Sequence, residues 1–199
     1  MQTPSHFLVT AVLAHKAPST RHRLHTSAFL VGSVLPDLPL LLLTIGYEIY
    51  YRWFATPPSS GSIMEYLHFE LFFTDPVWII SHNFFHSLVI NVVLLGVGYW
   101  GMQRKWRWAR PLFWLSIGSL FHTVLDIFTH HSDGPLLFFP LSWSYRFASP
   151  ISYWEGAYFG RAFTVFEYTL NSLLLAYFVW VWQKNRKRST TLQTPEGES

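Results

Sequence analysis

Long apolar runs separated by short polar links dominate the hydrophobic pattern of this chain. Four runs approach or exceed the roughly 20 residues that a helix needs to cross a bilayer. They are residues 27–50, 82–102, 111–131 and 164–182. A shorter apolar run at residues 6–17 lacks the basic segment and cleavage site of a signal peptide. The pattern predicts an all-α polytopic membrane protein with about four transmembrane helices and a short N-terminal half-helix.

Composition agrees with a membrane setting. Half of the residues are hydrophobic and 13% are charged, against about 25% charged in ordinary soluble domains. Cysteine is absent, which excludes disulfides, thiolate zinc sites and iron–sulfur clusters. We expect one helical domain over residues 1–183, followed by a basic and then polar disordered tail at residues 184–199.

Basic residues gather in three short segments that fall on the same side if all four runs span the membrane. The positive-inside rule makes that side cytoplasmic, so both termini are expected there, and the loops at 51–81 and 132–161 outside. We interpret the basic run of the tail as a topology anchor, and nothing supports nucleic-acid binding. The three clusters are Arg21 and Arg23; Arg104, Lys105, Arg107 and Arg110; and Lys184, Arg186, Lys187 and Arg188.

Histidine and aspartate recur every four residues in the second and third runs. The second run begins with His82 and His86, and the third contains His122, Asp126 and His130. Residues four apart share one helix face, and ionisable groups at membrane depth usually mark function. The two stripes predict a metal site between adjacent helices.

Helix rise places these residues in matching layers. Measured from the polar link between the two runs, His86 and Asp126 both lie about 24 Å up, at ~1.5 Å per residue. The same count puts His6 and Asp37 about 18 Å above the link that joins their own helices. We therefore expect the site in the outer half of the membrane.

The segment Pro36-Asp37-Leu38-Pro39 should break the first long run. Proline removes helical hydrogen bonds and kinks a span, which would turn Asp37 inward. The half-helix at 6–17 would begin near mid-membrane, where a backbone end is tolerated only against protein or a water-filled cavity. Both features predict a polar cavity open to the outer face.

Imidazole and carboxylate together suit zinc, iron or manganese. We expect one to three divalent transition metal ions, zinc first among them, held by His6, His82, His86, His122, Asp126 and His130. Asp37 and Asp133 are the expected catalytic residues, and Asp37 serves as a general base or as a further ligand. His131 lies about 100° around a helix from His130, so only one of the two should face the site.

Simpler interpretations stand beside these. An isolated histidine in a membrane helix is usually a packing group. Asp133 lies in Ser-Asp-Gly-Pro, which is also an ordinary turn sequence. Glu155 is a further ligand or a surface group, whereas Glu48 and Glu167 are expected at the interface or in helix pairing.

Several motifs together resemble the predicted bacterial membrane-bound, metal-dependent hydrolases of the inner membrane. The resemblance covers roughly residues 6–168 and implies a hydrolase and a metal, but no substrate. Family members often carry arginine at the position of Asn83, so a phosphate-binding role of that arginine has no counterpart there. The His-x-x-x-Asp helix is also similar, by analogy, to zinc-dependent phospholipase C. The motifs are Ser5-His6, Gly32-Ser-Val-Leu-Pro-Asp37, Ser81-His82-Asn-Phe-Phe-His86-Ser87, His122-Thr-Val-Leu-Asp126, Thr129-His130-His131-Ser132-Asp133-Gly134-Pro135 and Phe138-Phe-Pro140.

These observations predict a hydrolase at the outer side of a bacterial cytoplasmic membrane. Membrane lipids are the expected partners, and a lipid phosphoester is the expected substrate because a site at this depth is accessible to headgroups. The alternatives are a cation transporter, a bis-histidine haem protein or a catalytically inactive homologue. The sequence does not set the oligomeric state.

Overall fold

The computed structural model describes residues 1–17, 24–56 and 61–191, and the regular secondary structure of these residues is helical. The only β-type pairing in this part of the chain is an isolated bridge between Leu136 and Arg146. The helices in order are α1 Thr3–Lys16, α2 Thr26–Gly32, α3 Leu38–Trp53, α4 Ile63–Glu65, the π-helical η1 Tyr66–Leu71, α5 Phe72–Thr74, α6 Pro76–His86, α7 Leu88–Gln103, α8 Ala109–Ile127, the 3-10 turn η2 Gly156–Tyr158 and α9 Gly160–Thr191.

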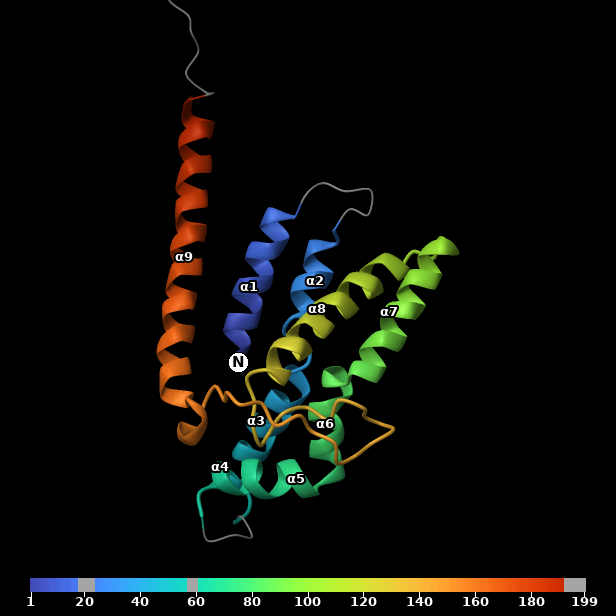
Figure 1. The fold of residues 1–199 in the computed structure, drawn as a ribbon, viewed down its shortest axis with the longest axis vertical. Coiled ribbons are helices and arrows are strands. Elements are labelled where there is room, and N and C mark those ends of the chain that lie inside the picture. Colours follow the sequence, from blue (N-terminus) through green and yellow to red (C-terminus); the bar gives the residue numbers. More distant parts are fainter. Residues whose placement is uncertain (18–23, 57–60, 192–199) are drawn as a thin grey trace, which may run out of the picture.

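The helices form a bundle around α8 (Figure 1). Helix α8 packs against α7 and α2, and α1 lies between α2 and α9. Helices α3 and α6 contact each other toward the lower end, where α4, η1 and α5 close the bundle. The long loop from residue 128 to 159 runs across this end. The all-α class predicted from the sequence is confirmed.

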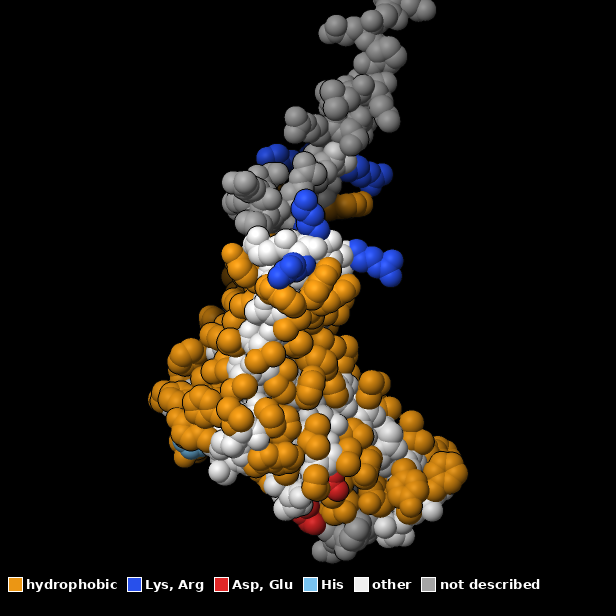
Figure 2. Space-filling model, turned by 90° about the vertical axis from the view of Figure 1, so that its right-hand side faces the viewer, with side chains coloured by type: hydrophobic (Ala, Val, Ile, Leu, Met, Phe, Trp, Pro, Cys, Tyr) orange, Lys and Arg blue, Asp and Glu red, His pale blue; other side chains and the backbone are white. Residues whose placement is uncertain are grey.

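The interior is polar and the surface apolar. Buried polar and charged residues outnumber buried hydrophobic ones in the described chain. Large side chains such as Leu42, Val165 and Leu173 are more than 60% exposed. Figure 2 shows lysine and arginine at one end, a hydrophobic surface along the middle, and acidic side chains near the other end. This distribution is typical of a protein surrounded by lipid, because lipid does not penalise exposed apolar surface.

A glycine pair brings α2 and α8 into backbone contact. A Cβ on Gly32 would lie 2.1 Å from the carbonyl oxygen of Leu115, and one on Gly118 would lie 2.2 Å from that of Phe29. Only glycine fits at both positions, and small residues at such contacts are how membrane helices approach closely. The contact sets the end of α2 against the face of α8 that carries His122.

Two helix breaks occur beside the site. Residues 33–37 separate α2 from α3, as the two prolines predict. The second break, at Ser87, bends α6 and α7 by 48°. Polar groups satisfy the interrupted backbone there: Ser87 Oγ accepts from the N–H of Ile90 and donates to the carbonyl of Phe139, and Asn91 donates to the carbonyl of Phe85 at 2.7 Å.

These breaks change the expected spans. Only α9, over Gly160–Lys187, is long and apolar enough by itself to cross a membrane among the described helices. Helices α6 and α7 pass together if the bent pair counts as one span. The prediction of about four spans is therefore not confirmed, because the polar site interrupts or shortens the other runs.

Two further boundaries differ from the sequence prediction. Helix α8 ends at Ile127. His122 and Asp126 of the predicted stripe therefore lie on the helix, whereas His130 lies in the following loop. At the other end of the chain, α9 continues through the basic run to Thr191, where a disordered tail was expected. Residues 192–199, and Arg21 and Arg23 of the first basic cluster, lie outside the described residues.

Candidate metal centre

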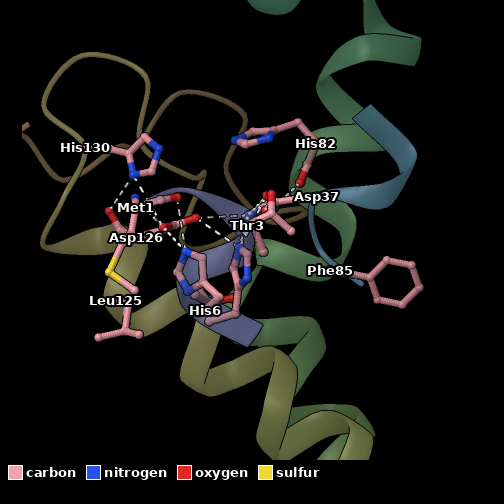
Figure 3. Close-up of polar contacts among 12 residues, drawn as sticks. Met1, Thr3, His6, Asp37, His82, Phe85, Leu125, Asp126 and His130 are labelled. Carbon is pink, nitrogen blue, oxygen red and sulfur yellow. Dashed lines mark hydrogen bonds and ion pairs between the residues drawn. The ribbon is translucent and has the colours of Figure 1, made fainter. Parts of the chain in front are cut away.

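Four side chains converge where α6, α8 and the turn before α3 meet. They are Asp37, His86, His122 and Asp126, and each offers one ligand atom within 4.8 Å of the others. His86 and Asp126 were predicted to lie at the same height along their helices, and this is confirmed because His86 Nε2 lies 3.4 Å from Asp126 Oδ2. Figure 3 shows Asp37 and Asp126 entering the cluster from different segments.

Backbone carbonyls fix the tautomers of both histidines. His86 Nδ1 lies 2.6 Å from the carbonyl oxygen of His82, and His122 Nδ1 lies 2.8 Å from that of Ser33. A carbonyl only accepts, so each Nδ1 carries the proton. In the neutral rings, both Nε2 lone pairs then point into the cluster. Metal-ligating histidines are held in this way.

The separations between the ligand atoms fit a small transition metal. The two Nε2 atoms are 3.1 Å apart, and their distances to Asp37 Oδ1 and Asp126 Oδ2 range from 3.0 to 3.5 Å. A tetrahedral zinc with bonds of ~2.0–2.1 Å separates its ligand atoms by about 3.3 Å. Two lone pairs and two carboxylates at this spacing repel one another unless a cation or protons lie among them. The donor set fits zinc, iron or manganese.

Asp126 has a different set of contacts on each oxygen. Its Oδ2 faces the two histidines, whereas Oδ1 accepts from His6 Nε2 at 2.9 Å and from the amino group of Met1 at 3.0 Å. The ring of His6 also stacks on that of His122, with centroids 3.7 Å apart. His6 therefore orients the cluster from its far side and is not one of the four converging groups.

Asp37 is the accessible member of the group. Its side chain is 24% exposed, against 0% for both histidines and 4% for Asp126. Thr3 on α1 donates to Asp37 Oδ2 at 2.5 Å, which leaves Oδ1 directed at the histidines. Asp37 thus combines contact with the cluster and access from outside it.

The two other predicted ligands lie beside the cluster (Figure 3). His82 is buried, and its ring centroid lies 4.5 Å from that of His86. Neither of its ring nitrogens has a hydrogen-bond partner in the described part of the chain. His130, beyond the end of α8, bonds to the carbonyl of Asp126 through Nδ1 at 3.0 Å. Neither belongs to the four-residue group: His82 lies one turn before His86 on the same helix α6, and His130 lies beyond the end of α8.

The candidates on the loop after α8 form a separate region. Asp133 accepts from the indole of Trp154 at 2.9 Å, and both line a cavity of about 520 Å³. Glu155 accepts from the backbone and hydroxyl of Ser132, and His131 stacks on Tyr158. None of these acidic or imidazole groups belongs to the four-residue cluster. The prediction that Asp133 lies in the same site is therefore wrong, because Asp133 lines the separate cavity.

Sequence reasoning missed the groups that hold the cluster in place. The carbonyl of Ser33 and the hydroxyl of Thr3 carry no chemical signature in a sequence. Tyr153, whose ring lies 4.7 Å from that of His130, was also missed. Burial raises the pKa of Tyr153, so its hydroxyl stays a neutral donor. Glu167 pairs helices as expected, because it accepts from the N–H of Gln2 at 2.7 Å.

Comparison with known proteins gives one finding. A family model described as YdjM inner membrane protein matches residues 1–191. This confirms the resemblance drawn from the motifs to the predicted inner-membrane metal-dependent hydrolases. No curated protein and no solved structure matches the chain.

Proposed function

The chain belongs to the YdjM inner membrane protein family, and we propose that it is a metal-dependent hydrolase acting at the outer side of the bacterial cytoplasmic membrane. The observation that carries this proposal is the pair of imidazoles, each fixed by a backbone carbonyl, whose Nε2 atoms face two carboxylates. Helix packing alone would not favour two imidazole lone pairs and two carboxylates at this spacing, because these groups repel one another.

The number and burial of the ligands support a catalytic site. A catalytic zinc typically takes three protein ligands and keeps a further position open. His86, His122 and Asp126 are buried and supply three, through Nε2, Nε2 and Oδ2. A divalent transition metal held there, zinc in this proposal, would supply Lewis acidity and an activated water near neutral pH.

Asp37 is the proposed general base. Its Oδ1 lies 3.3 Å from His122 Nε2, at the border of the cluster that is open to the surroundings. The bond from Thr3 occupies Oδ2, so Oδ1 is the oxygen free to accept a proton from the attacking water. His6, bonded to Asp126 Oδ1, orients that carboxylate without contacting substrate.

A lipid phosphoester is the proposed substrate class. The described surface around the bundle is apolar, and the cluster lies toward the end opposite the basic α7–α8 link. A lipid in the outer leaflet would bring its phosphate to that level while its chains stay in the bilayer. A soluble substrate would gain nothing from an apolar surround.

The sidedness is tested with single cysteines, because the chain has none of its own. Ser132→Cys on the loop after α8 should react with a membrane-impermeant maleimide in intact spheroplasts. Gln103→Cys at the end of α7 should react only after lysis. The reverse labelling would put the site on the cytoplasmic side.

One distance argues against the alternative hypothesis of a bis-histidine haem protein. The Nε2 atoms of His86 and His122 are 3.1 Å apart, which is too close to ligate a porphyrin iron from opposite faces.

A flux measurement distinguishes a cation transporter from a hydrolase. Uptake of zinc into proteoliposomes, without ester hydrolysis, would favour the transporter.

Hydrolysis itself is tested on full-length protein in non-ionic detergent with a panel of phospholipids. Metal-loaded protein should cleave a phosphoester, chelator-stripped protein should not, and metal should restore turnover. His122→Ala should be inactive, whereas His15→Ala, an exposed histidine on α1, should behave as wild type. Absence of turnover by metal-loaded protein across the panel would contradict the proposal.

A further inference from the structure

The cavity at the acidic end differs in chemistry from the metal centre. It has a volume of about 520 Å³ and lies between the helical segment 63–74 and the loop that follows α8. Aromatic rings make up much of its wall. They belong to Phe69, Phe72, Phe73, Tyr153 and Trp154.

Its formal charges are negative. The lining holds two carboxylates, Glu65 and Asp133, and neither lysine nor arginine is among the described residues that line it. Glu65 caps its own helix by accepting from the N–H of Ser62 at 2.9 Å. Asp133 has no such capping role and bonds instead to Trp154.

Asp133 has one oxygen satisfied and one not. Oδ2 accepts from the indole N–H of Trp154, whereas Oδ1 is enclosed and has no hydrogen-bond partner among the described residues. An enclosed carboxylate oxygen without a donor costs free energy. Because Oδ1 is enclosed, a cation in the cavity would stabilise the charge of the whole carboxylate rather than bond to Oδ1.

The nearest cation does not fill this role. Arg146 lies with its guanidinium carbon 5.4 Å from the ring centre of Phe72, and it donates to the carbonyl of Gly134. It forms no ion pair within 4.0 Å in the described chain. Its charge offsets one of the two carboxylates and leaves the region negative.

We propose that this cavity binds the ammonium headgroup of a zwitterionic phospholipid, with Asp133 as its counter-ion and the rings of Tyr153 and Trp154 around it. Ammonium groups are attracted both to carboxylates and to aromatic faces. An anionic headgroup would meet two carboxylates and no lining cation. The inference rests on the proposed function, because it names the lipid that the hydrolase would recognise.

Two short chains of contacts link the cavity to the metal centre. The ring of Phe72 lies 4.8 Å from that of His82, which in turn lies 4.5 Å from His86. On the other side Tyr153 lies 4.7 Å from His130, whose Nδ1 is 3.7 Å from Asp126 Oδ1. One histidine thus separates the cavity wall from the cluster on each side.

The test compares two short-chain lipids that differ only in their headgroups. Full-length protein in non-ionic detergent is titrated with a phosphatidylethanolamine and the matching phosphatidylglycerol, both below their micelle concentrations. The ethanolamine lipid should bind about tenfold more tightly. Asp133→Asn should remove most of this preference, while Glu70→Gln, an exposed acid on η1 outside the cavity lining, should keep it.

A second variant guards against misfolding of the first. Phe69 is 58% exposed and contributes one ring to the wall, so Phe69→Leu should fold and reduce the preference several-fold. Equal affinity for the two lipids in wild type, or an unchanged preference in Asp133→Asn, would overturn the inference.

Binding and turnover separate this inference from the proposed function. Metal-dependent hydrolysis without headgroup preference would leave the hydrolase standing and remove the ammonium site. Headgroup preference without hydrolysis would keep the ammonium site and remove the hydrolase.

Discussion

The candidate metal centre and the cavity at the acidic end are built in different ways. The centre takes three of its groups from α6 and α8, and carbonyls or neighbouring side chains hold its rings in fixed orientations. The cavity is formed by three-residue helices, a π-helical turn and loops, and it keeps an unmatched carboxylate oxygen at Asp133. The difference indicates that the groups held in fixed geometry lie mainly on regular helices, whereas the proposed headgroup site lies on short helical turns and loops.

The largest difference between the two regions is expected when one carboxylate is neutralised in each. Asp37→Asn should lower phosphoester turnover about 10²–10⁴-fold, the range for losing a general base, while most of the metal stays bound. Asp133→Asn should change headgroup preference and leave turnover of a headgroup-free phosphoester unchanged. Turnover and metal content of both variants are the measurements.

The outcome for Asp37 also settles its role. Loss of metal in Asp37→Asn would make it a fourth ligand, and unchanged turnover with full metal would remove it from the mechanism. Equal loss of turnover in both variants would mean that the two regions are not separate.

A smaller effect is expected from the contact that places His122. In Gly118→Ala the new Cβ would lie 2.2 Å from the carbonyl of Phe29, so α2 and α8 must separate. Overpacking of this kind typically costs about 1–3 kcal/mol. Thermal unfolding in detergent should show the loss, together with weaker metal binding.

Gly96→Ala on α7 is the matched control, since a Cβ there meets no atom within 4 Å. It should be neutral or slightly stabilising, because alanine is the better helix former. Equal stability of the two variants would contradict the close α2–α8 contact.

The smallest effect concerns Thr3. Thr3→Val removes the donor to Asp37 Oδ2, and a single hydrogen bond contributes about 0.5–1.5 kcal/mol. Turnover should therefore fall about two- to tenfold with metal content unchanged. Thr44→Val, which removes a hydroxyl bonded only within α3, should have no such effect; a fall as large as that of Thr3→Val would indicate a general effect of losing a hydroxyl.

Much of the cluster could be predicted from the sequence because spacing carries helix geometry. Four-residue intervals put His86 and Asp126 on facing stripes, and the proline pair around Asp37 predicted the break that brings it inward. The all-α class followed from the apolar runs. These features are local, so residue order alone encodes them.

Other features depend on contacts that no local pattern encodes. His82 and His130 fit the same spacing, but α8 ends before His130, and His82 lies one turn from His86 on α6, outside the point where the four ligand atoms converge. Asp133 shares a motif with His130, yet the loop turns it toward Trp154. His86, His122 and Asp126 replace apolar positions in α6 and α8, and the turn at residues 33–37, which carries Asp37, divides the first long run. Fewer helices therefore qualify as spans than the apolar runs predict.

Mass spectrometry of the purified full-length protein tests the proposed metal site most directly, by comparing the metal content of wild type and three histidine variants. We predict one tightly bound transition metal, zinc, in wild type, retained in His82→Ala and lost from His86→Ala and His122→Ala. A wild-type protein that binds no transition metal after incubation with zinc, or full occupancy in both His86→Ala and His122→Ala, would contradict the account.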